Sequence, residues 1–123
     1  MTEASKPIET SKLAGLALDY WVAVADGQRA EKFSHEGRGW VRLVGVGVPY
    51  APSTLWAQAG PIIEREHINL TCVWDPSPLH GPGPRWLARH PGPDGNGVLA
   101  MADTPLIAAM RAFVAAKLGP SVS

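Results

Sequence analysis

The sequence has a single cysteine and no surplus of charge of either sign. Cys72 cannot form an intramolecular disulfide, and no cysteine spacing indicates zinc. Eleven Lys and Arg residues balance eleven Asp and Glu residues, so the formal net charge is zero. General nucleic-acid binding is therefore disfavoured, because phosphate backbones are bound chiefly through excess positive charge.

Long hydrophobic runs are also lacking. The longest apolar stretch, Leu13 to Ala25, is interrupted by Asp19 and is shorter than the roughly 20 residues that span a bilayer. Residues 1–12 are polar, so we expect no signal peptide and no membrane contact. A cytoplasmic location is expected, and the lone thiol agrees with a reducing compartment.

Signatures of catalysis and of metal binding are absent as well. No Gly-x-Ser-x-Gly elbow surrounds any serine, and Gly45-Val46-Gly47 lacks the rest of a phosphate-binding loop. Glu64 and His67 are three residues apart, but the second acid–histidine pair of a carboxylate-bridged metal site is missing. We assign no catalytic residue, no metal site and no cofactor.

The residues that are present favour one α+β domain at residues 11–119, with tails at residues 1–10 and 120–123. Helices are expected at residues 11–26 and from Pro105 to a Gly-Pro stop, the second capped by Asp103 or Thr104. In the first helix the predicted buried stripe is Leu13, Leu16, Ala17, Tyr20, Trp21 and Val24. In the second it is Leu106, Ile107, Met110, Phe113, Val114 and Leu118.

These N- and C-terminal helices are expected to pack with a small antiparallel sheet of three to four strands. The candidate strands are residues 40–48, 68–74, 85–89 and 98–102, with residues 29–33 as a further candidate across a turn at 35–37. Asn96-Gly97 is a strong hairpin signal before the last strand. In strand 68–74, alternation places Cys72 and Trp74 on the buried face.

The stretch Tyr50 to Ile68 is the densest in distinctive side chains. It contains two prolines, a glycine, a tryptophan, an amide and a Glu-Arg-Glu-His run. We expect a helical turn at residues 52–58 and a second short helix from Gly60-Pro61, with Glu64 and Glu66 near its positive N-terminal end.

Aromatic and arginine side chains in this stretch are the expected anchors of a binding surface, because they dominate the energetics of many protein interfaces. The candidate surface is Tyr50, Ser53, Thr54, Trp56, Gln58, Glu64 and Arg65. Arg38 and Arg85 are candidates outside this stretch. The structural alternative is that Trp56 fills a gap beneath a loop and that Arg65 pairs with a neighbouring acid.

Three segments resemble one family. They are Leu-Ala-Gly-Leu-Ala-Leu-Asp-Tyr-Trp-Val-Ala at 13–23, Pro-Ser-Thr-Leu-Trp-Ala-Gln-Ala-Gly-Pro-Ile-Ile-Glu-Arg-Glu at 52–66, and Thr-Pro-Leu-Ile-Ala-Ala-Met-Arg at 104–111. In this order they are similar to a phage-associated family of unknown function that includes NinX-like proteins. Leu55 stands where we expect an acid, and Ala59 where we expect glycine. The resemblance implies a phage or prophage setting, and hence the cytoplasm of a host cell, but no activity.

Three functions follow as hypotheses. The favoured one is a phage accessory protein that acts without catalysis, as a binding module for a host or phage macromolecule, with a host or phage protein as candidate partner. The alternative is a small-molecule or nucleotide-handling enzyme with Glu64 or Glu66 as acid or base, which requires a pocket and a carboxylate of raised pKa. The third makes the central stretch a self-association seam in a homo-oligomer.

Overall fold

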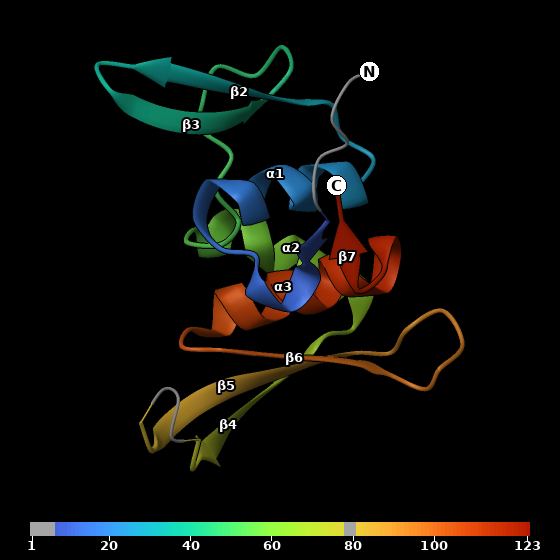
Figure 1. Cartoon of the computed structure of the whole chain (residues 1–123). Coiled ribbons are helices and arrows are strands. Elements are labelled where there is room, and N and C mark those ends of the chain that lie inside the picture. The colour runs from blue at the N-terminus through green and yellow to red at the C-terminus, as the bar shows by residue number, and fades with distance from the viewer. Residues whose placement is uncertain (1–6, 78–80) are drawn as a thin grey trace.

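The computed structural model describes residues 7–77 and 81–123, which form an α+β structure (Figure 1). Its helices are α1 (Gly15–Ala25), α2 (Trp56–Glu66) and α3 (Pro105–Leu118), with a 3-10 helix, η1 (Thr10–Lys12), before α1. Its strands are β1 (Ile8–Glu9), β2 (Ala30–His35), β3 (Arg38–Leu43), β4 (Asn69–Asp75), β5 (Gly83–His90), β6 (Val98–Ala102) and β7 (Ser121–Val122). The expected fold class is confirmed: helices near both ends pack with a small antiparallel sheet, here the three-stranded sheet β4-β5-β6.

Helix α3 lies at the centre of the molecule and separates the three-stranded sheet from the other helices (Figure 1). One side of α3 packs on β5 and β6, and the other side meets α1 and α2. The hairpin of β2 and β3 contacts α1, so the molecule is layered as hairpin, helices and sheet. Ala88, Ala100 and Ala102 are buried under α3, where their small side chains allow close approach of the helix.

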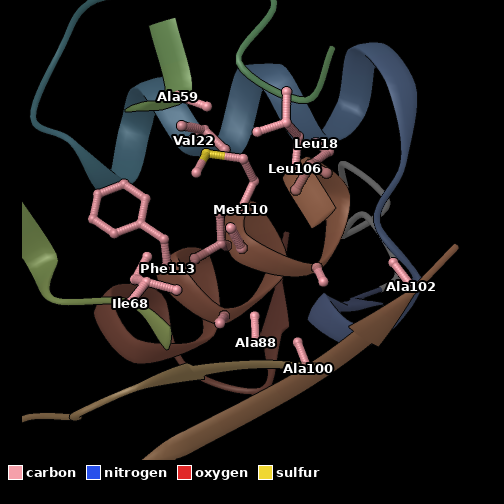
Figure 2. Close-up of a cluster of buried hydrophobic side chains, with 14 of the residues drawn as sticks. Leu18, Val22, Ala59, Ile68, Ala88, Ala100, Ala102, Leu106, Met110 and Phe113 are labelled. Carbon is pink, nitrogen blue, oxygen red and sulfur yellow. The ribbon is translucent and has the colours of Figure 1, made fainter. Parts of the chain in front are cut away.

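Met110 and Phe113 of α3 are fully buried among the core side chains (Figure 2). Leu18 and Val22 of α1 belong to the same cluster, as does Ile68 at the start of the sheet. The core thus joins elements from the beginning, middle and end of the chain, as a single hydrophobic core must.

Several turns and helix caps that the sequence predicts are present in the structure. Strands β2 and β3 pair across Glu36-Gly37, and β5 pairs with β6 through a loop that ends in Asn96-Gly97. The Thr104 hydroxyl accepts a hydrogen bond from Ile107 N–H at 3.2 Å, which is the N-cap expected for α3. Gly119 follows the last residue of that helix.

The first helix differs from the prediction in its start and in its buried face. It begins at Gly15, and residues 10–12 form η1 instead. Leu16, predicted to be buried, is exposed, whereas Leu18 and Val22 have no exposed surface. Because α1 is apolar on most sides and packs against both α3 and the β2–β3 hairpin, apolar spacing alone could not identify its inner face.

The central part of the chain also differs from the prediction. Strand β3 ends at Leu43 because the chain turns at Gly45, whose φ of 84° favours glycine. The two expected short helices are one continuous helix, α2, with Pro61 in its interior. Glu64 and Glu66 consequently lie in its last turn, where the helix dipole does not favour negative charge.

Two side chains of β4 that were expected in the core are on the surface, as is Leu118 at the end of α3. Cys72 is exposed, and Trp74 is 67% exposed, although both lie on the sheet face that α3 covers further along. The reason is that α3 packs mainly on β5 and β6 and leaves the far part of β4 uncovered. The alternation of side chains along β4 identified the sheet face on which α3 packs, but it could not show where along the strand α3 ends.

Residues near both termini, predicted to be tails, form ordered structure. Strand β1 pairs with β7 through Ile8–Val122 and Glu9–Ser121. Thr10 is buried, and its hydroxyl donates to the Gly119 carbonyl at 2.7 Å. Residues 1–6 of the predicted N-terminal tail lie outside the described residues.

Candidate functional site

Gln58 holds the loop before α2 against that helix. Its side-chain carbonyl accepts a hydrogen bond from Ala51 N–H at 2.6 Å, and its amide donates to the Pro49 carbonyl at 3.0 Å. Tyr50 lies between these two residues, and its main-chain N–H donates to the Val41 carbonyl at 2.6 Å. The amide of Gln58 therefore positions the loop, which explains a polar residue at this point of the helix.

Ser53 is a buried structural residue and not part of an exposed surface. Its N–H donates to Asp19 Oδ1 of α1 at 2.9 Å, and both residues are buried. Burial raises the pKa of the Asp19 carboxyl above its ordinary value, while the hydrogen bond from Ser53 N–H lowers it in part. Thr54 is exposed, and its hydroxyl bonds only locally to the Ala51 carbonyl at 3.3 Å among the described residues.

Three of the seven predicted residues, Tyr50, Gln58 and Arg65, line one pocket of about 280 Å³. The other lining residues are Asp26, Gln28, Leu43, Val46, Val48, Pro49, Pro61 and Ile62. Burial raises the pKa of the Tyr50 phenol to about 12, helped by the negative charges of Asp26 and Asp19. The phenol is therefore a neutral hydrogen-bonding group at the wall of a mainly apolar pocket.

Five exposed apolar side chains lie in the two chain segments that supply most of the pocket lining, in a set that we call the pocket rim: Val44, Val46, Val48, Leu55 and Trp56. Val46 and Val48 line the pocket itself, whereas the other three are exposed residues of the same two segments. Val48 is 58% exposed and Trp56 is 56% exposed. The first three belong to the loop after β3, and the last two to the start of α2, which Gln58 ties to that loop. Sequence reasoning found Trp56 but placed the valines in a strand, so it missed most of the rim.

Arg65, in the lining of the pocket, belongs to a network of charged side chains. Its guanidinium bonds to Asp26 Oδ1 at 2.6 Å and to Glu66 Oε2 at 3.0 Å. Glu66 Oε1 in turn lies 2.9 Å from His90 Nε2 and 3.2 Å from Lys117 Nζ. The network joins the end of α1 to α2, β5 and α3.

Glu66 carries the strongest electrostatic effect in this network. Burial opposes its ionisation, but hydrogen bonds from His90, Arg65 and Lys117 outweigh burial and lower the pKa of Glu66 to about 2. His90 Nδ1 accepts a hydrogen bond from Gly92 N–H at 2.8 Å, so in its neutral form the ring donates from Nε2 to Glu66. Glu66 is thus a permanently ionised structural carboxylate at neutral pH.

The family described as "Bacteriophage P22, NinX" matches residues 9–117 of this chain. The chain belongs to this family. No curated protein matches the chain. The match spans α1, α2 and α3 up to Lys117, and it therefore includes the pocket, the rim and the charged network. The expected resemblance is confirmed, and the protein is a phage protein.

The remaining predicted residues of this NinX-family chain lie apart from the pocket. Glu64 is exposed and does not line it. Arg38 is exposed at the start of β3, and Arg85 on β5 pairs with Asp75 and Asp103, each at 3.2 Å. These three residues do not join the candidate site.

Neither a metal centre nor a membrane span is found in the described residues. Across residues 7–77 and 81–123, no group of three or more His, Cys, Asp and Glu side chains is arranged to hold a metal ion. Glu64 and His67, the pair considered from the sequence, are therefore not completed into such a group there. In the same part of the chain, no helix has the length and apolar character needed to cross a bilayer.

Proposed function

We propose that this phage protein is a non-enzymatic binding module that holds a host or phage protein at the pocket rim. An apolar side chain of the partner would enter the pocket, and Val48 and Trp56 would pack around it. The observation that supports this proposal is a concave apolar pocket whose lining includes the exposed Val46 and Val48, with the exposed Trp56 two residues before the lining residue Gln58. Interface hot spots have this character, with an aromatic anchor beside a pocket.

The chemistry of the pocket favours a protein partner over a nucleic acid. Its guanidinium, Arg65, is already paired with Asp26 and Glu66, so it offers little uncompensated charge to a phosphate. Asp26 also lines the pocket and would repel an anion. An apolar segment of a protein needs neither phosphate contacts nor a cationic groove.

The enzyme alternative receives no comparable support. It requires an acid or base of raised pKa at the pocket, whereas the pKa of Glu66 is lowered to about 2. Asp19 has a raised pKa, but it is buried and bonded to Ser53 N–H. Neither carboxylate lines the pocket.

The proposal is tested by photo-crosslinking in phage-infected cells, with a benzophenone amino acid in place of Val48. The matched control carries the same probe in place of Leu99, which is 61% exposed on β6. We expect a discrete protein adduct from position 48 that mass spectrometry identifies and that position 99 does not give. Identical adduct patterns from the two positions would contradict the proposal.

The identified partner is then purified and its affinity measured by calorimetry. Val48→Asp and Trp56→Ala should each weaken binding at least about tenfold, because each removes apolar contact at the rim. Leu99→Asp introduces the same charge elsewhere and should leave affinity unchanged. Circular dichroism and thermal unfolding of all variants verify that the fold is retained; unchanged affinity in folded Val48→Asp and Trp56→Ala would refute the rim as the contact surface.

A further inference from the structure

We infer that strand β4 is a self-association edge, through which two copies of this chain pair antiparallel about a twofold axis at Cys72. This surface lies on the sheet, apart from the pocket rim, and the inference is independent of the proposed binding function. The occupant is a second copy of the same strand. Pairing would join two three-stranded sheets into one sheet of six strands.

The edge of the sheet at β4 is open in the described part of the chain. Strand β4 pairs there only with β5, and the sheet order β4-β5-β6 leaves its other side unpaired (Figure 1). Thr71, Cys72 and Trp74 are all exposed. An exposed edge strand offers a row of main-chain donors and acceptors to another strand.

The opposite edge of the same sheet is flanked by other parts of the chain. Arg111 Nη1 donates to the Met101 carbonyl of β6 at 2.9 Å, and its Nε donates to the Leu13 carbonyl at 2.7 Å. The segment after η1 is thereby fastened beside β6. Among the described residues, no side chain donates a hydrogen bond in this way to a main-chain carbonyl of β4 residues 69–74.

Strand β4 also lacks the devices that usually block edge pairing. Proteins protect such edges with lysine, proline, bulges or inward charges. The hairpin strands β2 and β3 carry charged residues in their interiors, at Glu31, Lys32 and Arg42. The interior of β4 has none: its one charged residue, Asp75, is the last and bonds to Arg85.

The sequence of β4 is complementary to itself when read in the opposite direction. It reads Asn-Leu-Thr-Cys-Val-Trp-Asp, which is symmetric in character about the central cysteine. In an antiparallel pair centred there, Leu70 faces Trp74 of the second copy, Thr71 faces Val73, and Asn69 faces Asp75. Aromatic–aliphatic and β-branched cross-strand pairs stabilise sheets, and no like charges oppose each other in this register.

The pairing also accounts for the exposed Trp74. The side chain is exposed in the single copy, and in the dimer it would pack on the Leu70 side chain of the other copy. An interface built on one strand of seven residues is small, so we expect a weak dimer that forms reversibly with concentration.

The register is tested by disulfide trapping of the full chain with copper-phenanthroline. Directly opposed residues in antiparallel strands have Cα atoms about 4.5 to 5.5 Å apart, within the range that a disulfide spans. We therefore expect Cys72 to form a covalent dimer rapidly. In the matched control, Cys72→Ser with Thr71→Cys, the two thiols are offset by about two residues, or roughly 6.6 Å along the strand, and should crosslink poorly. Equal crosslinking of both proteins would overturn the inference.

The equilibrium is tested separately by sedimentation velocity over a range of concentrations under reducing conditions. Cys72→Lys places two ammonium groups face to face and should raise the dimer dissociation constant at least about tenfold. Cys72→Ser should retain the dimer, and Leu99→Lys, which adds the same charge at an exposed position of β6, should leave it unchanged. A protein that is monomeric at every concentration, or a Leu99→Lys effect equal to that of Cys72→Lys, would refute pairing through β4.

Discussion

The charged network around Glu66 gives the most quantitative prediction. A lowering of the carboxyl pKa from 4.5 to about 2 corresponds to about 3 kcal/mol of folding free energy at neutral pH. The Glu66 side chain is only 12% exposed, so solvent screens these interactions little. Glu66→Gln keeps the shape and removes the charge, so we expect it to lower the free energy of unfolding by about 2 to 3 kcal/mol at pH 7.

The sign of the pH dependence follows from the direction of the shift. A carboxylate whose pKa is lower in the folded state stabilises the fold above the unfolded-state pKa, and this stabilisation is lost as pH falls through the folded-state pKa. For Glu66 the window lies between about pH 4.5 and pH 2. The gap between wild type and Glu66→Gln should therefore be full at pH 7 and fall to about half at pH 3.

The assay is urea unfolding at pH 7, 4 and 3, followed by tryptophan fluorescence. Glu64→Gln is the matched control, because Glu64 is an exposed acid on the same helix; it should change stability by less than about 0.5 kcal/mol. Equal effects of the two substitutions, or a Glu66→Gln gap that stays constant from pH 7 to pH 3, would refute the assignment of Glu66 as the ionised centre of the network.

Two further predictions concern the loop and helix around the pocket. Gln58→Ala removes the hydrogen bonds to Ala51 and Pro49, so it should cost about 1 to 2 kcal/mol in urea unfolding and speed amide exchange of the 49–51 loop; unchanged exchange would show that the loop is held otherwise. His67 ends α2 with φ 57°, a conformation that glycine adopts without strain, so His67→Gly should raise the thermal midpoint by a few degrees, and a lower midpoint would contradict a purely conformational role.

The sequence predicted best those elements whose ends are set by residues close to them in the chain. Helix α3 has a capping threonine, a proline in its first turn and a glycine at its end, and Leu106 and Met110 of its predicted stripe are buried. Each signal acts within a few residues, so tertiary context does not alter it. Helix α1 and strand β4 were predicted less well, because burial there depends on where the β2–β3 hairpin and α3 happen to lie.

The candidate site was predicted only in part, for a related reason. Tyr50, Gln58 and Arg65 line the pocket, but the valines of the rim come from a loop whose path depends on the turn at Gly45. Arg65 pairs with the neighbouring Glu66, as the structural alternative predicted, but the other partners of Glu66 lie 24 residues away at His90 and further still at Lys117. No local pattern connects Glu66 to those two residues. Sequence spacing cannot show which distant side chains a fold brings together.

Substitution of Arg65 cannot separate a loss of binding from a loss of stability. Arg65 lines the pocket, yet it also neutralises Asp26 and Glu66, and its guanidinium lies 5.9 Å from the ring centroid of Phe113. Arg65→Ala would leave two acids without this partner, so a loss of binding could follow from a change in the fold as readily as from a lost contact. Val48 and Trp56 are more than half exposed and take no part in the network. Their substitution should therefore change the contact surface without changing the stability of the fold, and the two effects can be measured separately.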